Sequence, residues 1–115
     1  MKTIDEILSD DTASAVVSDD QGFITEVNGR FKEDFGWTRT EIVGQPVTTI
    51  IPGSLRDAHN LGFARFLATG KPTLLGEVLR LDAELKDGTV VSAEHLIVAE
   101  RRDGRWCFAA SIRIV

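Results

Sequence analysis

Two histidines, His59 and His95, are the side chains of this 115-residue chain with the widest range of chemistry. A neutral imidazole titrates at about pH 6.5, ligates transition metals and exchanges protons near neutral pH. The chain has a single cysteine, Cys107, so no internal disulfide and no thiolate metal cluster can form within it. The two imidazoles are therefore the candidates for ligand or metal chemistry.

Sequence motifs of catalysis are missing around these histidines. The chain contains no nucleophile elbow, no His-Glu-x-x-His pair and no Gly-x-Gly-x-x-Gly phosphate loop. No Ser-His-Asp set can be assembled from elements that face one pocket. We expect a protein that binds or senses something, and not an enzyme.

His59 lies in the longest predicted helix. That helix begins with an N-cap at Ser54, directly after Pro52-Gly53, and ends at Gly70. Leu55, Gly62, Phe63 and Phe66 recur along it at helical spacing and share one face with His59. This pattern predicts that His59 faces the core.

His95 lies in the second of three predicted strands, which Asp-Gly turns at 87–88 and 103–104 join into an antiparallel meander. Alternation along the second and third strands predicts one inner face, made of Val91, Ala93, His95, Ile97, Trp106, Phe108, Ala110 and Ile112. In the first strand the odd positions should face inward, namely Leu75, Glu77, Leu79, Leu81, Ala83 and Leu85.

The first half of the chain supplies shorter elements. Residues 1–11 form a short amphipathic helix with the apolar stripe Ile4, Ile7 and Leu8, and residues 12–115 form one domain. Ala15–Ser18 and Phe23–Val27 read as a hairpin. Between 29 and 49 the chain is helical in short pieces, with a capping box at Thr38 and Glu41. The sequence therefore predicts an α+β fold.

Charge and hydropathy exclude two classes of partner. A formal net charge of -5 disfavours nucleic acid, because phosphate binding depends on Lys and Arg. The apolar runs are too short to cross a bilayer, and the N-terminus lacks a signal-peptide core, so no membrane contact and a cytoplasmic location are expected. A single domain of this size is expected to act through a signalling partner or as a homodimer.

The order of these elements resembles the PAS domain family. The segments 27–31, 35–44 and 86–89 are similar to recurrent segments of that family, in the expected order. The resemblance covers nearly the whole chain. It implies a five-stranded antiparallel sheet with helices packed on one face and a sensory role in signal transduction.

Within the PAS family, Ile51-Pro52, Arg56–His59 and Arg65–Gly70 are similar to the haem-binding FixL-type oxygen sensors. That resemblance implies heme b with His59 as the iron ligand and Arg65 as the partner of a propionate. It also implies a pocket lined by Leu55, Phe63, Phe66, Leu74, Leu79, His95, Ile97, Phe108 and Ala110. The sensed signal would be a diatomic gas or the redox state.

The chain departs from those oxygen sensors at three positions. Leu79 stands where they place an arginine that binds oxygen, and Glu77 stands where one relative has a methionine ligand. His95 stands where they have an apolar residue. It ligates the iron as a second metal ligand, hydrogen-bonds the bound gas, or only lines the pocket as a partly buried residue of the strand.

Two other interpretations stay open. His59 can be a core histidine satisfied by a carbonyl or water, in a cofactor-free PAS module that dimerises or docks. Such a module would use the outer face of the sheet and the helix that carries Ile4, Ile7 and Leu8. Alternatively, the cavity binds a flavin or another small organic ligand. Cys107 lies on a strand, which argues against a photoactive flavin adduct.

Overall fold

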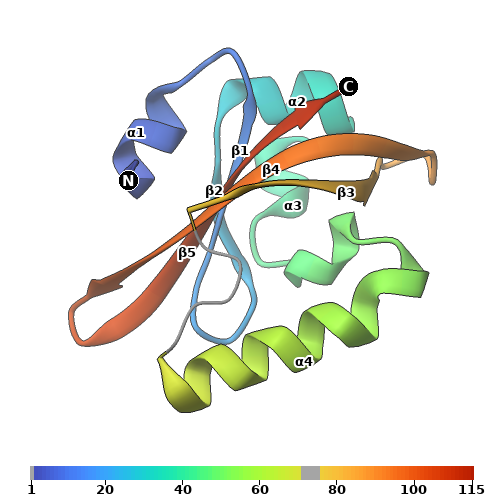
Figure 1. Ribbon diagram of the computed structural model, residues 1–115. Coiled ribbons are helices and arrows are strands. Elements are labelled where there is room, and N and C mark those ends of the chain that lie inside the picture. Colours follow the sequence, from blue (N-terminus) through green and yellow to red (C-terminus); the bar gives the residue numbers. More distant parts are fainter. Residues whose placement is uncertain (1, 71–75) are drawn as a thin grey trace.

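The computed structural model describes residues 2–70 and 76–115 and shows an α+β fold (Figure 1). Five strands form one antiparallel sheet in the order β2-β1-β5-β4-β3. This confirms the predicted five-stranded sheet. The strands are β1 (Ser14–Ser18), β2 (Ile24–Val27), β3 (Val78–Glu84), β4 (Val90–Arg102) and β5 (Arg105–Ile114).

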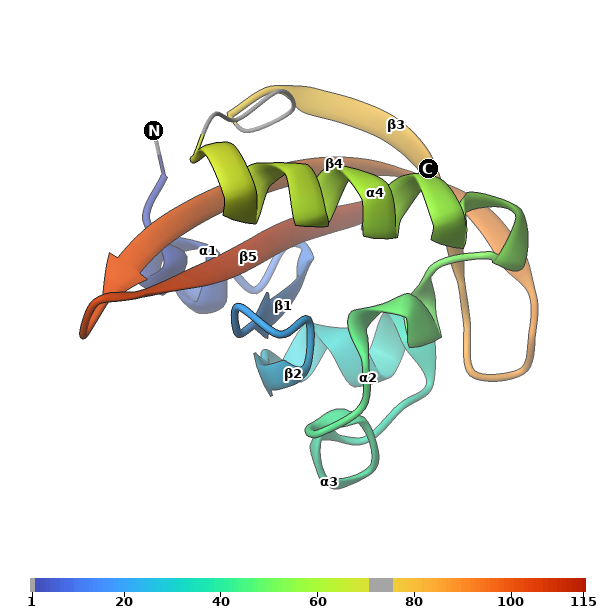
Figure 2. The ribbon, with the colours of Figure 1, turned by 90° about the horizontal axis from the view of Figure 1, so that it is seen from below.

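Helices cover both faces of the sheet, although unequally (Figure 2). One face carries α2, α3, the 3₁₀ helix η1 and α4, as predicted, whereas α1 packs on the other face. None of the described helices is long and apolar enough to span a bilayer. The helices are α1 (Ile4–Ser9), α2 (Gly29–Phe35), α3 (Arg39–Ile42), η1 (Val47–Ile50) and α4 (Gly53–Thr69).

The packing of α1 explains why the second strand lacks a clean alternation. Ala93 faces the inner core at 0% exposure, and Val98 faces α1 at 1%. Both faces of β4 are therefore buried along part of its length. The apolar stripe of α1 is used inside the chain, since Ile4 and Ile7 are 0% and 1% exposed. The expectation that this stripe forms a contact surface for a partner is wrong, because the sheet already covers it.

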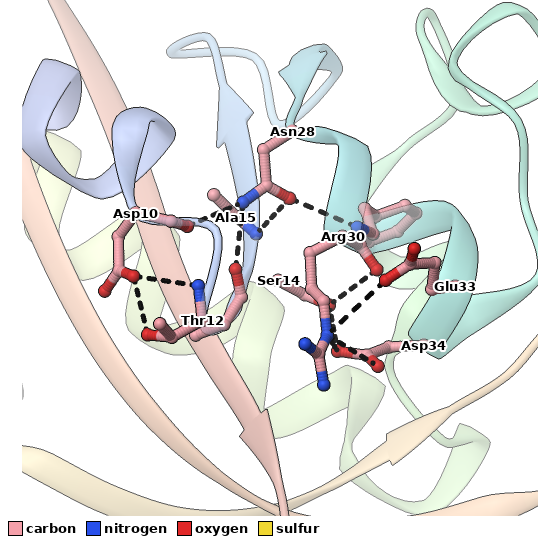
Figure 3. Close-up of polar contacts among 10 residues, drawn as sticks. Asp10, Thr12, Ser14, Ala15, Asn28, Arg30, Glu33 and Asp34 are labelled. Atoms are coloured by element: carbon pink, nitrogen blue, oxygen red, sulfur yellow. Dashed lines mark hydrogen bonds and ion pairs between the residues drawn. The ribbon is translucent and has the colours of Figure 1, made fainter.

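One amide joins the N-terminal segment to the first hairpin and to α2 (Figure 3). The Asn28 side-chain oxygen accepts hydrogen bonds from the backbone nitrogens of Ala15, at 3.0 Å, and Phe31, at 3.1 Å. Its Nδ2 donates to the carbonyls of Asp10, at 3.0 Å, and Ala13, at 2.9 Å. Asn28 is thus both the N-cap of α2 and a clamp on the segment that follows α1.

The turns and caps follow the predicted chemistry closely. Asp103 and Gly104 both have positive φ, 52° and 77°, as a two-residue hairpin turn of the primed type requires. The Thr38–Glu41 capping box is present. Gly70 ends α4 in the left-handed conformation, and its N–H donates to Phe66 O at 2.7 Å. Local sequence rules suffice for these features because each depends on neighbouring residues alone.

Two predicted boundaries are wrong. The long helix begins at Gly53, with Pro52 at the N-cap position and no side-chain capping bond, and so Ser54 is not its cap. The strand β3 begins at Val78, and Glu77 before it is exposed and does not face inward as its parity suggested. Leu75, the predicted start of that strand, lies outside the described residues.

Candidate functional site

A cavity of about 300 Å³ lies between α4 and the inner face of the sheet. Its walls are largely apolar, and its polar lining residues are Ser18, His59, Asp82 and His95. A cavity of this kind, apolar with a few polar groups, is typical of a small-molecule site. The predicted site residues that line it are Leu55, His59, Phe63, His95, Ile97, Phe108 and Ala110.

His59 projects from the middle of α4 toward this cavity and is half-buried. Its ring stacks on that of Phe63, one helical turn along, with centroids 6.1 Å apart and an interplanar angle of 16°. Burial lowers the pKa of the His59 imidazole, and a hydrogen bond with Asn60 offsets part of this effect. Its Nδ1 is buried and has no hydrogen-bond partner among the described residues.

His95 reaches the same cavity from β4, between Leu79 of β3 and Ile112 of β5. Its Nδ1 lies 3.3 Å from the carbonyl oxygen of Ala93. Burial lowers the pKa of His95 and the contact with Ala93 raises it by less, so the ring is neutral at pH 7. If Nδ1 carries the proton and donates it to Ala93, Nε2 keeps its lone pair.

Aromatic contacts hold α4 against the sheet beside the cavity. Phe63 packs on Phe108 of β5, with ring centroids 5.1 Å apart. Phe66 meets Trp106 and Phe108 edge-on, at 4.9 Å and 5.2 Å. Near the start of the helix, the Arg56 Nε donates to the carbonyls of Thr48 and Ile51, at 3.1 Å and 2.9 Å. The helix is therefore fixed by polar contacts at its start and by rings further along.

Three of the predicted site residues that the structure describes do not line the cavity, and a fourth is not described. Arg65 is exposed, and Leu79 is half-buried without lining the cavity. Phe66 is 9% exposed but is occupied by Trp106 and Phe108, so it packs α4 to the sheet instead. Leu74 lies outside the described residues.

Several lining residues are missing from the sequence prediction. They are Val16, Ser18, Val47, Ile50, Ile51, Ala58, Leu81, Asp82, Ala109 and Ile112. The strand β1 is buried at every position, so alternation gives no sign of its inner face. Asp82, assigned by parity to the outer face, contributes to the lining. The i, i+3 spacing of Val47 and Ile50 is a local signal from which an inward face of η1 could have been predicted.

The thiol of Cys107 lies on the opposite side of the sheet from this cavity. It packs against the cluster that α1 forms with the outer face, and it is half-buried. Across the described residues, no group of three or more His, Cys, Asp or Glu side chains could hold a metal ion. Of the polar residues that line the cavity, His59 and His95 are the two whose side chains are imidazoles, and Ser18 and Asp82 add a hydroxyl and a carboxyl.

Comparison with known proteins identifies the family. The sequence profile described as PAS domain matches residues 12–113. An uncharacterized protein of Azorhizobium caulinodans is 38% identical over 101 residues, which are 87% of this chain and 14% of that protein. The sensor protein FixL of Bradyrhizobium diazoefficiens is 28% identical over 89 residues, which are 77% of this chain and 17% of that protein. The chain thus spans less than a fifth of the length of either relative.

Solved structures share the fold at low identity. The PAS domain of a protein from Colwellia psychrerythraea superposes with a TM-score of 0.75 at 19% identity, covering 90% of this chain and 86% of the other. The structure of the RsLOV d2 variant gives a TM-score of 0.67 at 18% identity, covering 97% and 64%. With the profile match over nearly its whole length and this shared architecture, the chain belongs to the PAS domain family.

Proposed function

We propose that this PAS domain is a sensory signalling module that holds b-type haem in the cavity under α4, with His59 as an axial ligand of the iron. The observation that carries the proposal is the buried Nδ1 of His59, which has no hydrogen-bond partner among the described residues. A buried polar atom left unpaired costs about 1–3 kcal/mol, and native proteins keep few of them. A ligand in the cavity would remove that cost.

The donor set fits haem better than it fits a bare metal ion. A structural or catalytic zinc, for example, takes three or four protein ligands, and the described residues offer no such group. Haem would need only one or two side chains, because the macrocycle supplies the other donors to the iron. When bound, haem would supply reversible binding of a diatomic gas or of an electron.

The walls of the cavity suit an apolar group, although the cavity is small for a porphyrin. Ile97, Phe108 and Ala110 of the sheet face Leu55 and Phe63 of α4 across it. A volume of about 300 Å³ lies at the lower end of the range for ligand sites, so a porphyrin requires α4 to move away from the sheet. Such a movement would break the contact of Phe63 with Phe108, which contains no hydrogen bond.

The position of His95 favours a second ligand over a hydrogen-bond donor. Its Nδ1 faces the Ala93 carbonyl at 3.3 Å, and a ring that donates there has no second proton on Nε2 while it is neutral. A ligating histidine commonly donates its other N–H to a backbone carbonyl in this way. We therefore infer that His95 would be the second residue to hold the iron if haem is bound, with Nε2 as the donor atom.

A displacement of His95 in β4 would also affect α1, which packs on the other face of the sheet. Further along β4, Ile97 lines the cavity and Val98 packs against α1 on the other face. The backbone N–H of Ile4 in α1 also donates to Glu100 of β4, at 2.6 Å. A shift of β4 would thus reach α1 by two contacts, one apolar and one polar.

The test is the visible spectrum of the purified protein during a titration with hemin. A sharp Soret band that is lost in His59→Ala and kept in Asp57→Ala supports the proposal, because Asp57 is exposed on the same helix. In His95→Ala the band should persist and shift to that of a lower coordination number. A band of equal strength in His59→Ala would refute ligation by His59.

A flavin or another small organic ligand is the second candidate. The volume of the cavity and the likeness of the fold to light-oxygen-voltage domains, such as the RsLOV d2 variant, favour it. Any such binding would be non-covalent, because Cys107 lies on the other face of the sheet. A titration with flavin mononucleotide, followed by flavin fluorescence, distinguishes a flavin-binding domain from a haem-binding one. A folded protein that takes up neither ligand would indicate a cofactor-free interaction module.

A further inference from the structure

The two edges of the sheet differ in how they are protected. At the β2 edge, the Ile24 N–H donates to Gln45 O and the Gly44 N–H donates to Ile24 O, both at 2.8 Å. The Val47 N–H donates to Gly22 O at 2.8 Å. The chain that precedes η1 therefore closes this edge by pairing with its backbone.

The β3 edge has no such cover among the described residues. β3 pairs with β4 on one side only, and it forms one border of the molecule in Figure 2. Two apolar side chains of the strand, Val78 and Leu81, are 65% and 37% exposed. An open strand of this length presents unpaired backbone groups that can template pairing with another strand.

We propose that β3 pairs antiparallel with β3 of a second copy of this chain, about a two-fold axis that passes by Leu81. Each Arg80 then lies opposite Asp82 of the second copy, so the interface gains two pairs of opposite charge. The two Leu81 side chains lie opposite each other and cover their exposed surface. The result is one continuous sheet through both copies.

The charges along the strand select this register from its neighbours. Residues opposite each other in an antiparallel pair have their side chains on the same face of the sheet. In a pair of identical strands, opposite positions must therefore be an even number of residues apart, and the two-fold axis passes by a residue and not between two residues. An axis at Arg80, Asp82 or Glu84 sets that charge against its own copy. An axis at Ala83 sets Asp82 against Glu84. The axis at Asp82 also sets Arg80 opposite Glu84, but at the cost of the Asp82 pair. Among the registers centred between 80 and 84, the one at Leu81 is therefore the only one that opposes unlike charges without setting any charge of the strand against its like.

The side chains concerned are available for these contacts. The ion pair of Arg80 with Glu94 is long, at 3.8 Å, and the Arg80 side chain is 65% exposed. Asp82 has no ion pair within the part of the chain that the structure describes. Leu81 and Asp82 also line the cavity, so one strand serves as cavity wall and as proposed interface. The pairing does not depend on which ligand the cavity binds.

Sedimentation of the purified chain over a wide concentration range tests the pairing. A single seven-residue strand buries less area than a standard stable interface, so the expected dimer is weak and concentration-dependent. Arg80→Asp and Asp82→Arg should each weaken it at least about tenfold, and the double reversal should restore it. Arg105→Asp is the control, since it makes the same charge change at an exposed arginine on another strand.

A disulfide tests the register directly. In a Cys107→Ser background, Leu81→Cys should cross-link across the axis under mild oxidation, because opposite Cα atoms lie about 4.5–5.5 Å apart. Val78→Cys should not, since it pairs with position 84 of the second copy and lies about 20 Å from its own counterpart. A monomer at every concentration, or equal cross-linking of the two cysteines, would overturn the proposal.

Discussion

The ring of Phe63 on α4 packs on the ring of Phe108 on β5, with centroids 5.1 Å apart and planes inclined by 56°. Both side chains also line the cavity, so this contact joins the helix to the sheet across the candidate site. Toward the start of α4, Arg56 binds two backbone carbonyls. We infer that α4 covers the cavity as a lid that is anchored by Arg56 and closed by aromatic rings.

Phe63→Ala should destabilise the protein by about 1–3 kcal/mol, because it removes a half-buried ring and its contact with Phe108. Urea unfolding gives the change in the free energy of unfolding. Leu61→Ala is the matched control on the same helix: Leu61 is 62% exposed, and its loss should cost less than about 0.5 kcal/mol. Equal effects of the two substitutions would mean that the rings do not hold α4.

Asn28→Ala should cost about 2–4 kcal/mol, because four backbone groups lose their partner at once. The stability of Asn28→Asp should lie between that of the wild-type protein and that of Asn28→Ala. Its carboxylate still accepts from the backbone N–H groups of Ala15 and Phe31, but it donates nothing to the carbonyls of Asp10 and Ala13. Hydrogen exchange at the amide nitrogens of Ala15 and Phe31 reports the loss directly. An Asp variant as unstable as the Ala variant would assign the role of Asn28 to its donor bonds alone.

Much of the second half of the chain was predictable because its rules are local. The Asp-Gly turns fix the meander, and the parity of Phe108 and Ala110 on β5 places both at the cavity. The inward direction of His59 follows from helical spacing with Leu55 and Phe63. Each of these features depends on residues within a few positions of one another.

The remaining features depend on contacts between distant segments. The packing of α1 on β4 requires apolar residues on both faces of that strand, so its alternation is lost. No residue near Val98 in the sequence indicates this packing. Phe66 shares a helix face with His59, but Trp106 and Phe108 occupy its ring. The closure of the β2 edge by the segment 44–47 also depends on where η1 lies in space.

The free energy of unfolding should fall as the pH is lowered from about 7 to 5. Burial lowers the pKa of both His59 and His95 below 6.5, so the unfolded chain binds more protons in this range than the folded one. Above the pKa of the two imidazoles in the unfolded chain, both rings are neutral in either state and the fold has its full stability. Part of that stability is lost as the pH falls toward the lower pKa values of the folded chain. Urea titrations at several pH values measure the slope. The double variant His59→Gln, His95→Gln should flatten it, and an unchanged slope would contradict this origin.

The carboxyl of Glu41 should titrate with a pKa of about 2. The largest cause is the hydrogen bond that it accepts from Lys86 Nζ, at 2.7 Å, followed by those that it accepts from the backbone N–H and the hydroxyl of Thr38. Lys86→Gln should raise this pKa, yet leave it below 4.5 because the bonds with Thr38 remain. An NMR titration measures both values. Lys32→Gln, on α2, removes a lysine without this contact and should leave the pKa of Glu41 unchanged.

Two alanine-to-leucine substitutions on the inner face of the sheet should have opposite effects on stability. Ala110 lines the cavity, so the larger side chain in Ala110→Leu enters open space and should stabilise the fold by about 1 kcal/mol. Ala93 is 0% exposed within the packed core, so Ala93→Leu should destabilise it by about 1–3 kcal/mol. Thermal and urea unfolding compare the two.

The Ala110→Leu variant also separates folding from ligand binding. It should take up less hemin than the wild-type protein although it is at least as stable, because its side chain occupies the space between Ile97 and Phe108 that the ligand needs. Loss of stability in Ala110→Leu would mean that the cavity is filled in solution. Undiminished uptake by a stable variant would place the bound group elsewhere on the protein.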